Sequence, residues 1–401
     1  MDKSFEVAEV RERMETKLGE KLSFLVASPG RINLIGEHTD YNMGYSVPSA
    51  INKFVFVGFV KLEGCDTAEK EEFQAEVISL DYEQSFTLTE VKKMEGKCWV
   101  NYVLGVIARI GQIQEGVRGK YRIIITGNLG VGLGISSSSA LCCGVAYGLN
   151  KLLNVNLSLE DLCYVAQWSE HHYIGTKGGL LDQTAILFSQ GSSFIKVDFL
   201  TSEKSFYQVP FPMSVILLHS GEYHSLSETC YNKRVTECKE AAHLILKAAE
   251  KTISEPVTLR ECDLDDLHKA EHTLDPTLFK RAKYVIEENL RVEHILTRIL
   301  EKDYDEIRKI MHATHTGLSQ LYEVSTEKLD FLANTSNTLT NEAFGARLMG
   351  GGFGGCTINL VHPDKEELFI QKMGEAFKQH YNEDLKVIAV KLSKGVHHYD
   401  F

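Results

Sequence analysis

Residues 127–140 read Gly127-Asn128-Leu129-Gly130-Val131-Gly132-Leu133-Gly134-Ile135-Ser136-Ser137-Ser138-Ser139-Ala140. The residues before them, 121–126, have the apolar pattern of a strand, and residues 140–153 after them have that of a helix. Glycine lets consecutive backbone N–H groups approach an anion, and a helix start adds unpaired donors and about half a positive charge. This stretch is therefore typical of a phosphate cradle, and its four serine hydroxyls could bond phosphate oxygens or a hydrated Mg²⁺.

A flexible loop that ends in a serine N-cap fits the same glycine cluster, so the pattern alone leaves both interpretations open. Neither common nucleotide fingerprint fits the chain. No Gly-Lys pair is followed by Ser or Thr, as a P-loop requires. Residues 350–355 satisfy G-x-G-x-x-G, but the strand-like residues 357–361 follow where a dinucleotide fold needs a helix. A Rossmann dehydrogenase is therefore disfavoured.

Strand and helix patterns are mixed along the whole chain. Residues 54–59 form an almost wholly apolar run, as in a strand buried on both faces, and residues 99–107 repeat at helical spacing. Residues 228–322 have a helical pattern, and strands return near residues 357–361 and 386–392 with a helix between them. These patterns predict an α+β fold.

The length of 401 residues exceeds the usual span of one hydrophobic core, so two domains are expected. Pro210 and Pro212 interrupt the pattern before a predicted strand at residues 215–218. We therefore divide the chain into domains at 1–210 and 211–401.

The charge balance bears on the class of ligand. Lys+Arg 43 and Asp+Glu 55 give a formal net charge of -12, which repels phosphate backbones and anionic lipid. No segment approaches the roughly 18 apolar residues that cross a bilayer, and the first residues lack the basic start and apolar stretch of a leader. We expect a cytoplasmic protein that binds small molecules, with neither nucleic acid nor membrane as a partner.

A second polar stretch precedes the glycine-rich one. It reads Ser28-Pro29-Gly30-Arg31-Ile32-Asn33-Leu34-Ile35-Gly36-Glu37-His38-Thr39-Asp40-Tyr41-Asn42. Its Arg, Glu, His, Asp and Asn side chains could offer donors and acceptors to a polyhydroxylated ligand, although a salt-bridged surface turn has the same composition. The spacing does not suit a metal site on one helix face.

Together these segments resemble the three motifs of the GHMP small-molecule kinases, in the family's order. Residues 30–42 resemble the galactokinase signature G-R-x-N-L-I-G-E-H-T-D-Y-N, and residues 127–140 resemble the loop G-N-x-P-x-G-x-G-L-S-S-S-A. Residues 347–356 resemble the late motif M-T-G-G-G-F-G-G-C. Further segments that look like galactokinase positions are residues 99–103, 166–171, 179–183 and 231–234.

The resemblance implies an N-terminal domain like ribosomal protein S5 domain 2, a C-terminal ferredoxin-like domain and an active site between them. It also implies ATP-dependent phosphorylation of the anomeric hydroxyl of galactose, with ATP and Mg²⁺ bound. We expect the chain to act as a monomer.

The resemblance assigns the catalytic and sugar-binding roles residue by residue. Asp182 would accept the proton of the sugar O1 hydroxyl, and Arg31 would keep that carboxylate ionised and stabilise charge developing at O1. Whether Asp182 is a true base or an electrostatic guide stays open, because phosphoryl transfer depends mostly on positioning and charge stabilisation. The expected sugar-binding residues are Glu37, His38, Asp40, Gly179 and Tyr231.

The same resemblance implies a nucleotide site along the serine loop and near the tryptophan segment. Ser138 and Glu170 would supply oxygen donors to Mg²⁺, with Ser137 as the near alternative. The expected nucleotide-binding residues are Trp99, Asn101, Tyr102, Gly132, Gly134, Ser136, Ser137, Ser138 and Ser139.

Several positions depart from the galactokinase pattern. In the loop, Gly130 replaces the proline and Leu133 the usual serine or alanine. The segment at 219–224, His219-Ser220-Gly221-Glu222-Tyr223-His224, differs from N-S-N-x-x-H, and the tail at 394–399 lacks the G-A-G ending. Gly178 stands where Cys is common, and Met349 stands where Thr is common. The sugar assignment is weakened more than the chemistry, because the catalytic positions are retained.

Three other functions stay open. Residues 179–187 and 231–235 also resemble galacturonokinase, but a C6 carboxylate would be repelled by Glu37, so Glu37 and His38 favour a neutral C6 hydroxyl. N-acetylgalactosamine is compatible with the sequence, because room at C2 is a question of shape. A galactose sensor without catalysis is disfavoured, because such proteins are damaged in the serine loop, whereas residues 136–140 are intact here and Asp182 is present.

Overall fold

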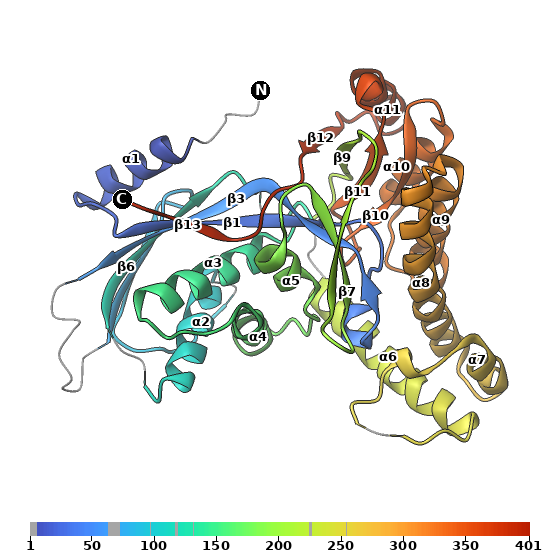
Figure 1. The fold of residues 1–401 in the computed structure, drawn as a ribbon, viewed down its shortest axis with the longest axis horizontal. Helices are drawn as coiled ribbons and strands as arrows, with labels where there is room; N and C mark the ends of the chain where they lie inside the picture. The colour runs from blue at the N-terminus through green and yellow to red at the C-terminus, as the bar shows by residue number, and fades with distance from the viewer. Residues whose placement is uncertain are drawn as a thin grey trace.

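The computed structural model describes residues 6–62, 73–96, 98–116, 119–130, 132–223, 227–253 and 255–401. Val131 of the glycine-rich loop, His224 and residues 1–5 lie outside this described part of the chain. The molecule has two lobes, with a long twisted sheet in the N-terminal lobe and most of the late helices in the other (Figure 1).

A six-stranded sheet forms the N-terminal lobe, in the order β13-β1-β3-β6-β4-β5. Its strands are β1 (Phe24–Asn33), β3 (Pro48–Lys61), β4 (Gln74–Ser79), β5 (Gln84–Leu88), β6 (Lys120–Gly127) and β13 (His397–Asp400). Neighbours pair antiparallel, except that β4 and β6 are parallel. β1 is buried along its whole length, and β3 contains the apolar run at 54–59 that predicted a strand buried on both faces.

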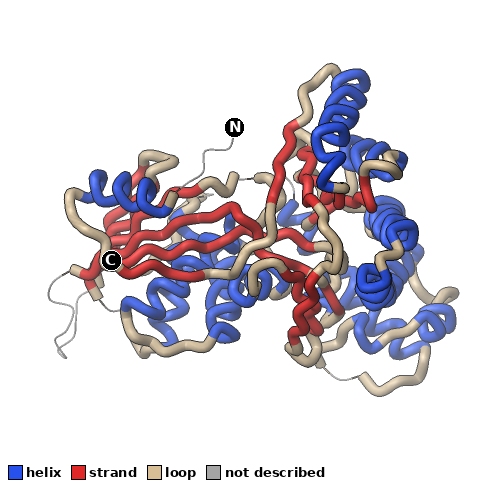
Figure 2. The backbone as a smooth tube through the Cα atoms, turned by 45° about the horizontal axis from the view of Figure 1, so that its top comes forward, coloured by secondary structure: helices blue, strands red, loops and turns tan. Residues whose placement is uncertain are grey.

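Helices cover both faces of this sheet (Figures 1 and 2). α1 (Val7–Leu18) packs Val10 and Met14 on one face. The opposite face carries α2 (Val100–Ile113), α3 (Ser137–Leu152), α4 (Leu159–Ser169) and α5 (Leu181–Phe188). The predicted helices at 99–107 and 140–153 therefore correspond to α2 and α3, and the predicted strand at 121–126 is β6.

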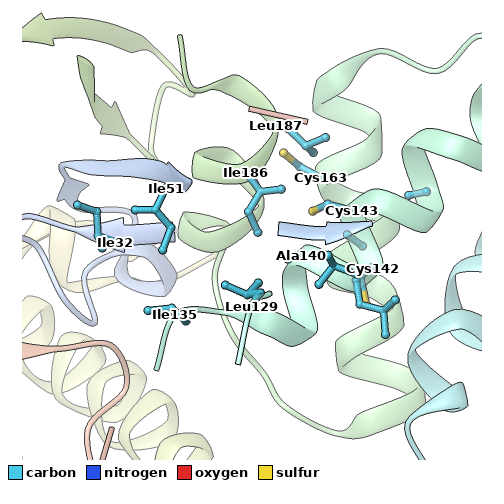
Figure 3. Close-up of a cluster of buried hydrophobic side chains, with 14 of the residues drawn as sticks. Ile32, Ile51, Leu129, Ile135, Ala140, Cys142, Cys143, Cys163, Ile186 and Leu187 are labelled. Atoms are coloured by element: carbon cyan, nitrogen blue, oxygen red, sulfur yellow. The ribbon is translucent and has the colours of Figure 1, made fainter. Parts of the chain in front are cut away.

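The glycine-rich loop rests on a buried apolar cluster (Figure 3). Leu129 and Ile135 of the loop are 7% and 1% exposed, and they pack with Ile32 of β1, Cys143 of α3 and Ile186 of α5. Burying an aliphatic side chain contributes about 1.5–3 kcal/mol. The loop is therefore anchored at both ends by its own apolar side chains, which argues against the alternative of a flexible surface loop.

The second lobe contains a four-stranded antiparallel sheet in the order β10-β11-β9-β12. Its strands are β9 (Ser214–His219), β10 (Ala343–Met349), β11 (Cys356–Val361) and β12 (Lys386–Val390). In chain order these strands are arranged 2-3-1-4, with α11 (Glu366–Tyr381) connecting the last two. This is the β-α-β-β-α-β arrangement of a ferredoxin-like domain, as the resemblance implied.

A helical insertion separates β9 from β10. Its helices are α6 (Ser227–Ala248), α7 (Leu264–Ala270), α8 (Pro276–Glu301), α9 (Tyr304–Thr316) and α10 (Glu327–Thr338). α8 begins sharply because Asp275 accepts a hydrogen bond from the Thr277 N–H at 2.7 Å and Pro276 occupies the first turn. The helical pattern predicted for residues 228–322 is confirmed. None of the helices described is long and apolar enough to cross a membrane.

Two features of the chain path concern the boundary between the lobes. A small sheet of β2 (Tyr45–Ser46), β7 (Ser193–Asp198) and β8 (Lys204–Gln208) ends just before residue 210. The C-terminal tail then returns to the first lobe. β13 pairs with β1, and the C-terminus lies beside the N-terminal sheet (Figure 2). Residues 397–400, which the division at 210 assigned to the second domain, therefore complete the first sheet.

Candidate active site

A cavity of about 760 Å³ lies between the two lobes. Its walls combine the polar stretch after β1, the glycine-rich loop and the start of α5 with the glycine turn between β10 and β11. The predicted site residues that line it are Arg31, Glu37, His38, Asp40, Trp99, Tyr102, Gly132, Gly134, Ser136, Ser137, Ser138, Ser139, Glu170, Gly179, Asp182 and Tyr231. One cavity thus unites residues that are separated by up to two hundred positions in the sequence.

Asn101 is the exception among the predicted residues. It is 2% exposed and is absent from the cavity wall, and its amide bonds both the N–H and the C=O of Met94, at 2.8 and 2.9 Å. Both ends of the Asn101 side chain are therefore engaged in fixing the segment before α2. The structure thus does not bring Asn101 to the cavity wall, and its contact with the nucleotide stays a prediction.

The glycine-rich loop has the backbone of an anion-binding nest. Gly132, Gly134 and Ser136 have positive φ angles of 75°, 72° and 58°, alternating with residues of ordinary φ. This alternation turns successive N–H groups toward one side. Within the described residues, the N–H groups of 132–139 donate to no protein acceptor. Because α3 begins at Ser137, the positive end of its dipole is directed at the same place.

Gly130 and Leu133, the two loop positions that depart from the family pattern, pack against each other. A Cβ atom built on Gly130 would lie 2.5 Å from Leu133 Cδ1, so the Leu133 side chain fills the space that a larger residue at 130 would need. Leu133 is 6% exposed and joins the apolar cluster beneath the loop. Gly130 and Leu133 are therefore a packed pair that replaces the family's proline and small residue without changing the serine stretch.

Asp182 lies at the mouth of the nest, in the first turn of α5. Its Oδ1 accepts a hydrogen bond from Arg31 Nε at 2.7 Å, and its Oδ2 accepts from the Ser136 hydroxyl at 2.5 Å. Arg31 is 6% exposed, and burial disfavours its charge, but the Asp182 and Glu37 carboxylates outweigh that effect and raise the pKa of Arg31 above its ordinary value. The Asp182 side chain is 29% exposed, which leaves it open to the cavity.

A second carboxylate, Glu170, lies beside Asp182 at the end of α4. Glu170 Oε1 accepts from the Ser139 hydroxyl at 3.0 Å, and Oε2 accepts from the Gln183 amide at 2.6 Å. Burial raises the pKa of Glu170 to about 7, and the negative charge of Asp182 adds to the increase. The Ser139 hydroxyl thus bonds the carboxylate that was predicted to hold Mg²⁺ together with Ser138, and Ser138 lines the same cavity.

Residues of the second lobe donate hydrogen bonds to the carboxylate of Glu37. Its Oε1 accepts from both terminal nitrogens of Arg347, each at 3.2 Å, and from the Gly350 N–H at 2.9 Å. Arg347 is fully buried and also bonds the carbonyls of Asn33 and Leu34. The two lobes therefore meet around Glu37.

Asp40 and Gly179 are in close contact on the sugar-facing side expected from the resemblance. Asp40 accepts hydrogen bonds from the N–H groups of Tyr41 at 2.9 Å and Leu181 at 3.2 Å. A Cβ built on Gly179 would lie 2.3 Å from Asp40 Oδ2, so only glycine fits there. Burial raises the pKa of Asp40 to about 6, with the charge of Asp182 as a further cause.

His38 and Tyr231 form an aromatic wall beside these carboxylates. Their ring centroids are 5.3 Å apart, and His38 Nδ1 lies 2.8 Å from the Tyr41 hydroxyl. Burial lowers the pKa of His38 to about 4, so the ring is neutral at neutral pH. Burial also raises the pKa of Tyr231 well above its ordinary value, so its hydroxyl keeps its proton.

Trp99 and Tyr102 are also part of the cavity wall. Trp99 donates from Nε1 to Gln84 at 2.7 Å, and its ring lies 6.0 Å from that of Tyr82. Tyr82 and its neighbour Asp81 also line the cavity, although the sequence had not indicated them. They follow β4, and only the pairing of β4 with β6 brings them to the loop.

Arg347 and the glycines at 350–352 are further residues at the site for which the sequence predicted no role. They lie within the late motif at 347–356, so the resemblance itself contained the signal. Their role depends on a contact between the lobes, which a motif does not specify.

Comparisons with known proteins agree with this geometry. Family models match at residues 12–60 (galactokinase galactose-binding signature), 101–190 (GHMP kinases N terminal domain) and 295–379 (GHMP kinases C terminal). The galactokinase of Thermotoga petrophila is 33% identical over 375 residues, covering 92% of this chain and 99% of the relative. The chain belongs to the galactokinase family.

Other family members extend the similarity. The galactokinase of Pyrococcus furiosus is 34% identical, covering 92% of this chain and 98% of its own length. The crystal structure of Lactococcus lactis galactokinase complexed with galactose has a TM-score of 0.88 at 28% identity, covering 98% of this chain and 99% of that one. The Methanococcus jannaschii mevalonate kinase, with a TM-score of 0.62 at 17% identity, shares the fold. The predicted α+β GHMP kinase fold and family are thus confirmed.

Proposed function

We propose that this chain transfers the γ-phosphoryl group of ATP to the O1 hydroxyl of galactose, releasing ADP. The observation that carries the proposal is the position of Asp182. Its carboxylate is bonded to Arg31 and Ser136 and faces a cavity between the lobes. It lies beside the N–H groups of 132–139, which donate to no acceptor in the described part of the chain. A sugar hydroxyl next to Asp182 would face a phosphate held by the loop.

In the proposed reaction the O1 hydroxyl loses its proton to Asp182 Oδ1 or Oδ2 while an O1 lone pair attacks the γ-phosphorus. The bond from that phosphorus to the bridging oxygen breaks, and ADP leaves. Arg31 keeps its charge and stabilises both the carboxylate and the negative charge that develops at O1. Transfer of this type depends mainly on alignment and charge stabilisation, so Asp182 contributes as acceptor and as guide.

The loop supplies the phosphate-binding groups. Backbone donors from Gly132 to Ser139 and the start of α3 stabilise phosphate oxygens without needing a cationic side chain. Trp99, Tyr102 and Tyr82 offer aromatic surface in the cavity wall, and the proposal locates adenine there. The triphosphate would then extend from the aromatic end toward Asp182.

The donor set near Glu170 fits Mg²⁺. Magnesium prefers oxygen ligands and is usually held by one or two carboxylates together with substrate phosphates and water. The Glu170 carboxylate and the Ser138 hydroxyl would hold it, with Ser139 bonded to the same carboxylate. When bound, the ion neutralises charge on the phosphates. In the described residues no cluster of three His, Cys, Asp or Glu side chains could bind it without the nucleotide.

Galactose is the proposed acceptor over galacturonate. Glu37 and Asp40 are buried carboxylates at the sugar side of the cavity, and a sugar carboxylate there would add a third negative charge. Hydroxyl groups instead satisfy buried acceptors, and leaving such acceptors unpaired is costly. N-acetylgalactosamine stays an alternative that the assay below distinguishes.

The cavity is lined by one chain, so the proposal needs no partner subunit, and a monomer is the proposed working unit. Because ATP is the phosphoryl donor, we propose that the protein acts in the cytoplasm.

The decisive experiment measures ADP release with galactose, N-acetylgalactosamine, galacturonate, arabinose and glucose. Fastest turnover with galactose supports the proposal. Binding of galactose and ATP without ADP release would instead favour the sensor, and preference for another sugar would reassign the acceptor.

A further inference from the structure

The carbonyl groups of residues 132–135 accept hydrogen bonds, whereas among the described residues the N–H groups of 132–139 donate to no protein acceptor. Gly132 C=O lies 3.3 Å from His219 Nε2, and Leu133 C=O accepts from the Cys356 thiol at 3.0 Å. Gly134 C=O accepts from Arg31 Nη1 at 2.7 Å, and Ile135 C=O accepts from the Arg31 N–H at 3.2 Å. The carbonyl groups of four consecutive loop residues, 132–135, therefore each have a hydrogen-bond partner.

Two of these four contacts come from the second lobe. His219 ends β9 and Cys356 begins β11, and the two residues are direct cross-strand partners. They therefore reach the loop as one unit from the C-terminal sheet. The other two contacts come from Arg31 of the N-terminal lobe, so the loop is held between the lobes.

The hydrogen bonds of His219 define its tautomer. Its Nδ1 accepts a hydrogen bond from the Gly221 N–H at 2.9 Å, and a nitrogen that accepts cannot carry a proton. The proton of the neutral ring is therefore on Nε2, which donates to Gly132 C=O. Burial is the main cause that lowers the pKa of His219, which favours the neutral ring. The hydrogen bond to Gly132 and the charge of Glu222 act against this decrease, and Lys386 adds to it.

Tyr223, four residues after His219, packs against the phosphate loop. A Cβ built on Gly132 would lie 2.8 Å from Tyr223 Cδ1, and the Tyr223 ring lies 5.0 Å from that of His219. Both segments that meet here depart from the family pattern. The segment at 219–224 does so at His219, and the phosphate loop does so at Gly130 and Leu133.

We propose that His219 is a positioning residue for nucleotide binding, whose Nε2–H holds Gly132 C=O from the second lobe and so keeps the loop N–H groups directed at the phosphates. The inference rests on the proposed function in taking ATP as the ligand. It makes no claim on sugar binding, because His219 is not among the residues that line the cavity.

Two variants distinguish the roles of the two ring nitrogens of His219. In His219→Gln the amide nitrogen takes the place of Nε2 and can still donate to Gly132. In His219→Asn the shorter amide takes the place of Nδ1 and can still cap Gly221, but it does not reach Gly132. The readouts are the dissociation constant of a non-hydrolysable ATP analogue with Mg²⁺, measured by calorimetry, and the KM values for ATP and galactose.

Because His219→Asn loses the hydrogen bond to Gly132, we expect it to weaken nucleotide binding and to raise the KM for ATP by about three- to tenfold. The KM for galactose and the melting temperature should stay close to those of the unmodified protein, and His219→Gln should restore nucleotide affinity to within about twofold. Cys356→Ala tests the neighbouring contact and should weaken nucleotide binding in the same direction, with Cys356→Ser as its matched control.

Unchanged nucleotide affinity in His219→Asn overturns the proposal. Equal weakening in His219→Gln and His219→Asn overturns it too, because the Nε2 donor would then not matter. The calorimetric measurement does not depend on turnover, so it remains informative if the unmodified chain binds ATP without phosphorylating galactose.

Discussion

Glu37 and Arg347 form an ion pair that spans the two lobes. Both terminal nitrogens of Arg347 lie 3.2 Å from a single oxygen of Glu37, and the guanidinium is fully buried. The carboxylate proposed to select the sugar is therefore also the counter-charge of a buried cation. Substitutions at Glu37 should change stability as well as specificity, and the two effects need different variants.

Glu37→Ala should destabilise the protein by about 3–5 kcal/mol, because it leaves the Arg347 charge buried without its partner. Glu37→Gln keeps an oxygen for Arg347 and should lose less. A fall in melting temperature that is clearly larger for Ala than for Gln would support this, whereas equal melting temperatures would contradict it.

The better-folded Glu37→Gln variant then tests sugar selection. Loss of the negative charge should narrow the difference in relative rate between galactose, fucose and galacturonate, with nucleotide affinity unchanged. Relative rates identical to those of the unmodified protein would remove Glu37 from discrimination at C6.

Asp182→Asn should lower turnover by at least about 100-fold, since positioned proton acceptors typically contribute 10²–10⁴-fold. The amide has the same shape, so calorimetry should still detect galactose and ATP binding. Ser136→Ala is the control, because it removes only the 2.5 Å hydrogen bond to Asp182 and should cost about tenfold or less. Near-normal turnover in Asp182→Asn would exclude this residue from the chemistry.

Gly178 and Gly179 offer a matched pair of substitutions. A methyl group at 179 would meet Asp40 Oδ2 at 2.3 Å, whereas at 178 the nearest atom is the Tyr231 hydroxyl at 3.9 Å. Gly179→Ala should raise the KM for galactose by about tenfold, the effect of a displaced charged hydrogen-bonding group, with little change in the KM for ATP. Gly178→Ala should behave like the unmodified protein, and equal effects of the two would argue against the contact.

Asp40 predicts a pH dependence of stability. Burial raises its pKa from 3.8 to about 6, so in that interval the folded protein holds a proton that the unfolded chain has released. Stability is therefore lost as pH rises through this interval. Asp40→Asn removes the effect, so its melting temperature relative to the unmodified protein should increase between pH about 4 and about 7. A difference that does not change with pH would contradict the assignment.

Glu170→Gln should raise the Mg²⁺ concentration required for half-maximal rate by about tenfold or more, because it removes the charged oxygen donor. Ser139→Ala keeps the carboxylate and serves as the control with a smaller effect. Titration of the rate with Mg²⁺ at saturating ATP distinguishes them, and an unchanged Mg²⁺ requirement in Glu170→Gln would place the ion elsewhere.

Much of the site was predictable because it lies in short continuous motifs. The positive φ angles at Gly132 and Gly134 follow from glycine itself, and a helix over 140–153 follows from the apolar pattern after the serines, although α3 already begins at Ser137. The resemblance implied that Arg31 lies next to Asp182, and Arg31 Nε donates to Asp182 Oδ1 at 2.7 Å. The elements that carry these motifs were predictable for the same reason, since their periodicity is local.

The surroundings of Asn101 could not be predicted from local pattern. A polar residue at the start of a helix can face a ligand or its own chain, and here it bonds Met94. Asp81 and Tyr82 were missed because their approach to the cavity depends on the pairing of β4 with β6.

The family, the two-lobed α+β fold and the residues that can carry charge and hydrogen bonds were all predictable from the amino-acid sequence, because they depend on residue types at fixed local spacing. The pairing of Arg347 with Glu37, the contacts of His219 and Cys356 with the loop and the return of β13 to β1 became evident from the folded chain alone. Such contacts join segments far apart in the chain, and they arise from how the lobes bury surface against each other.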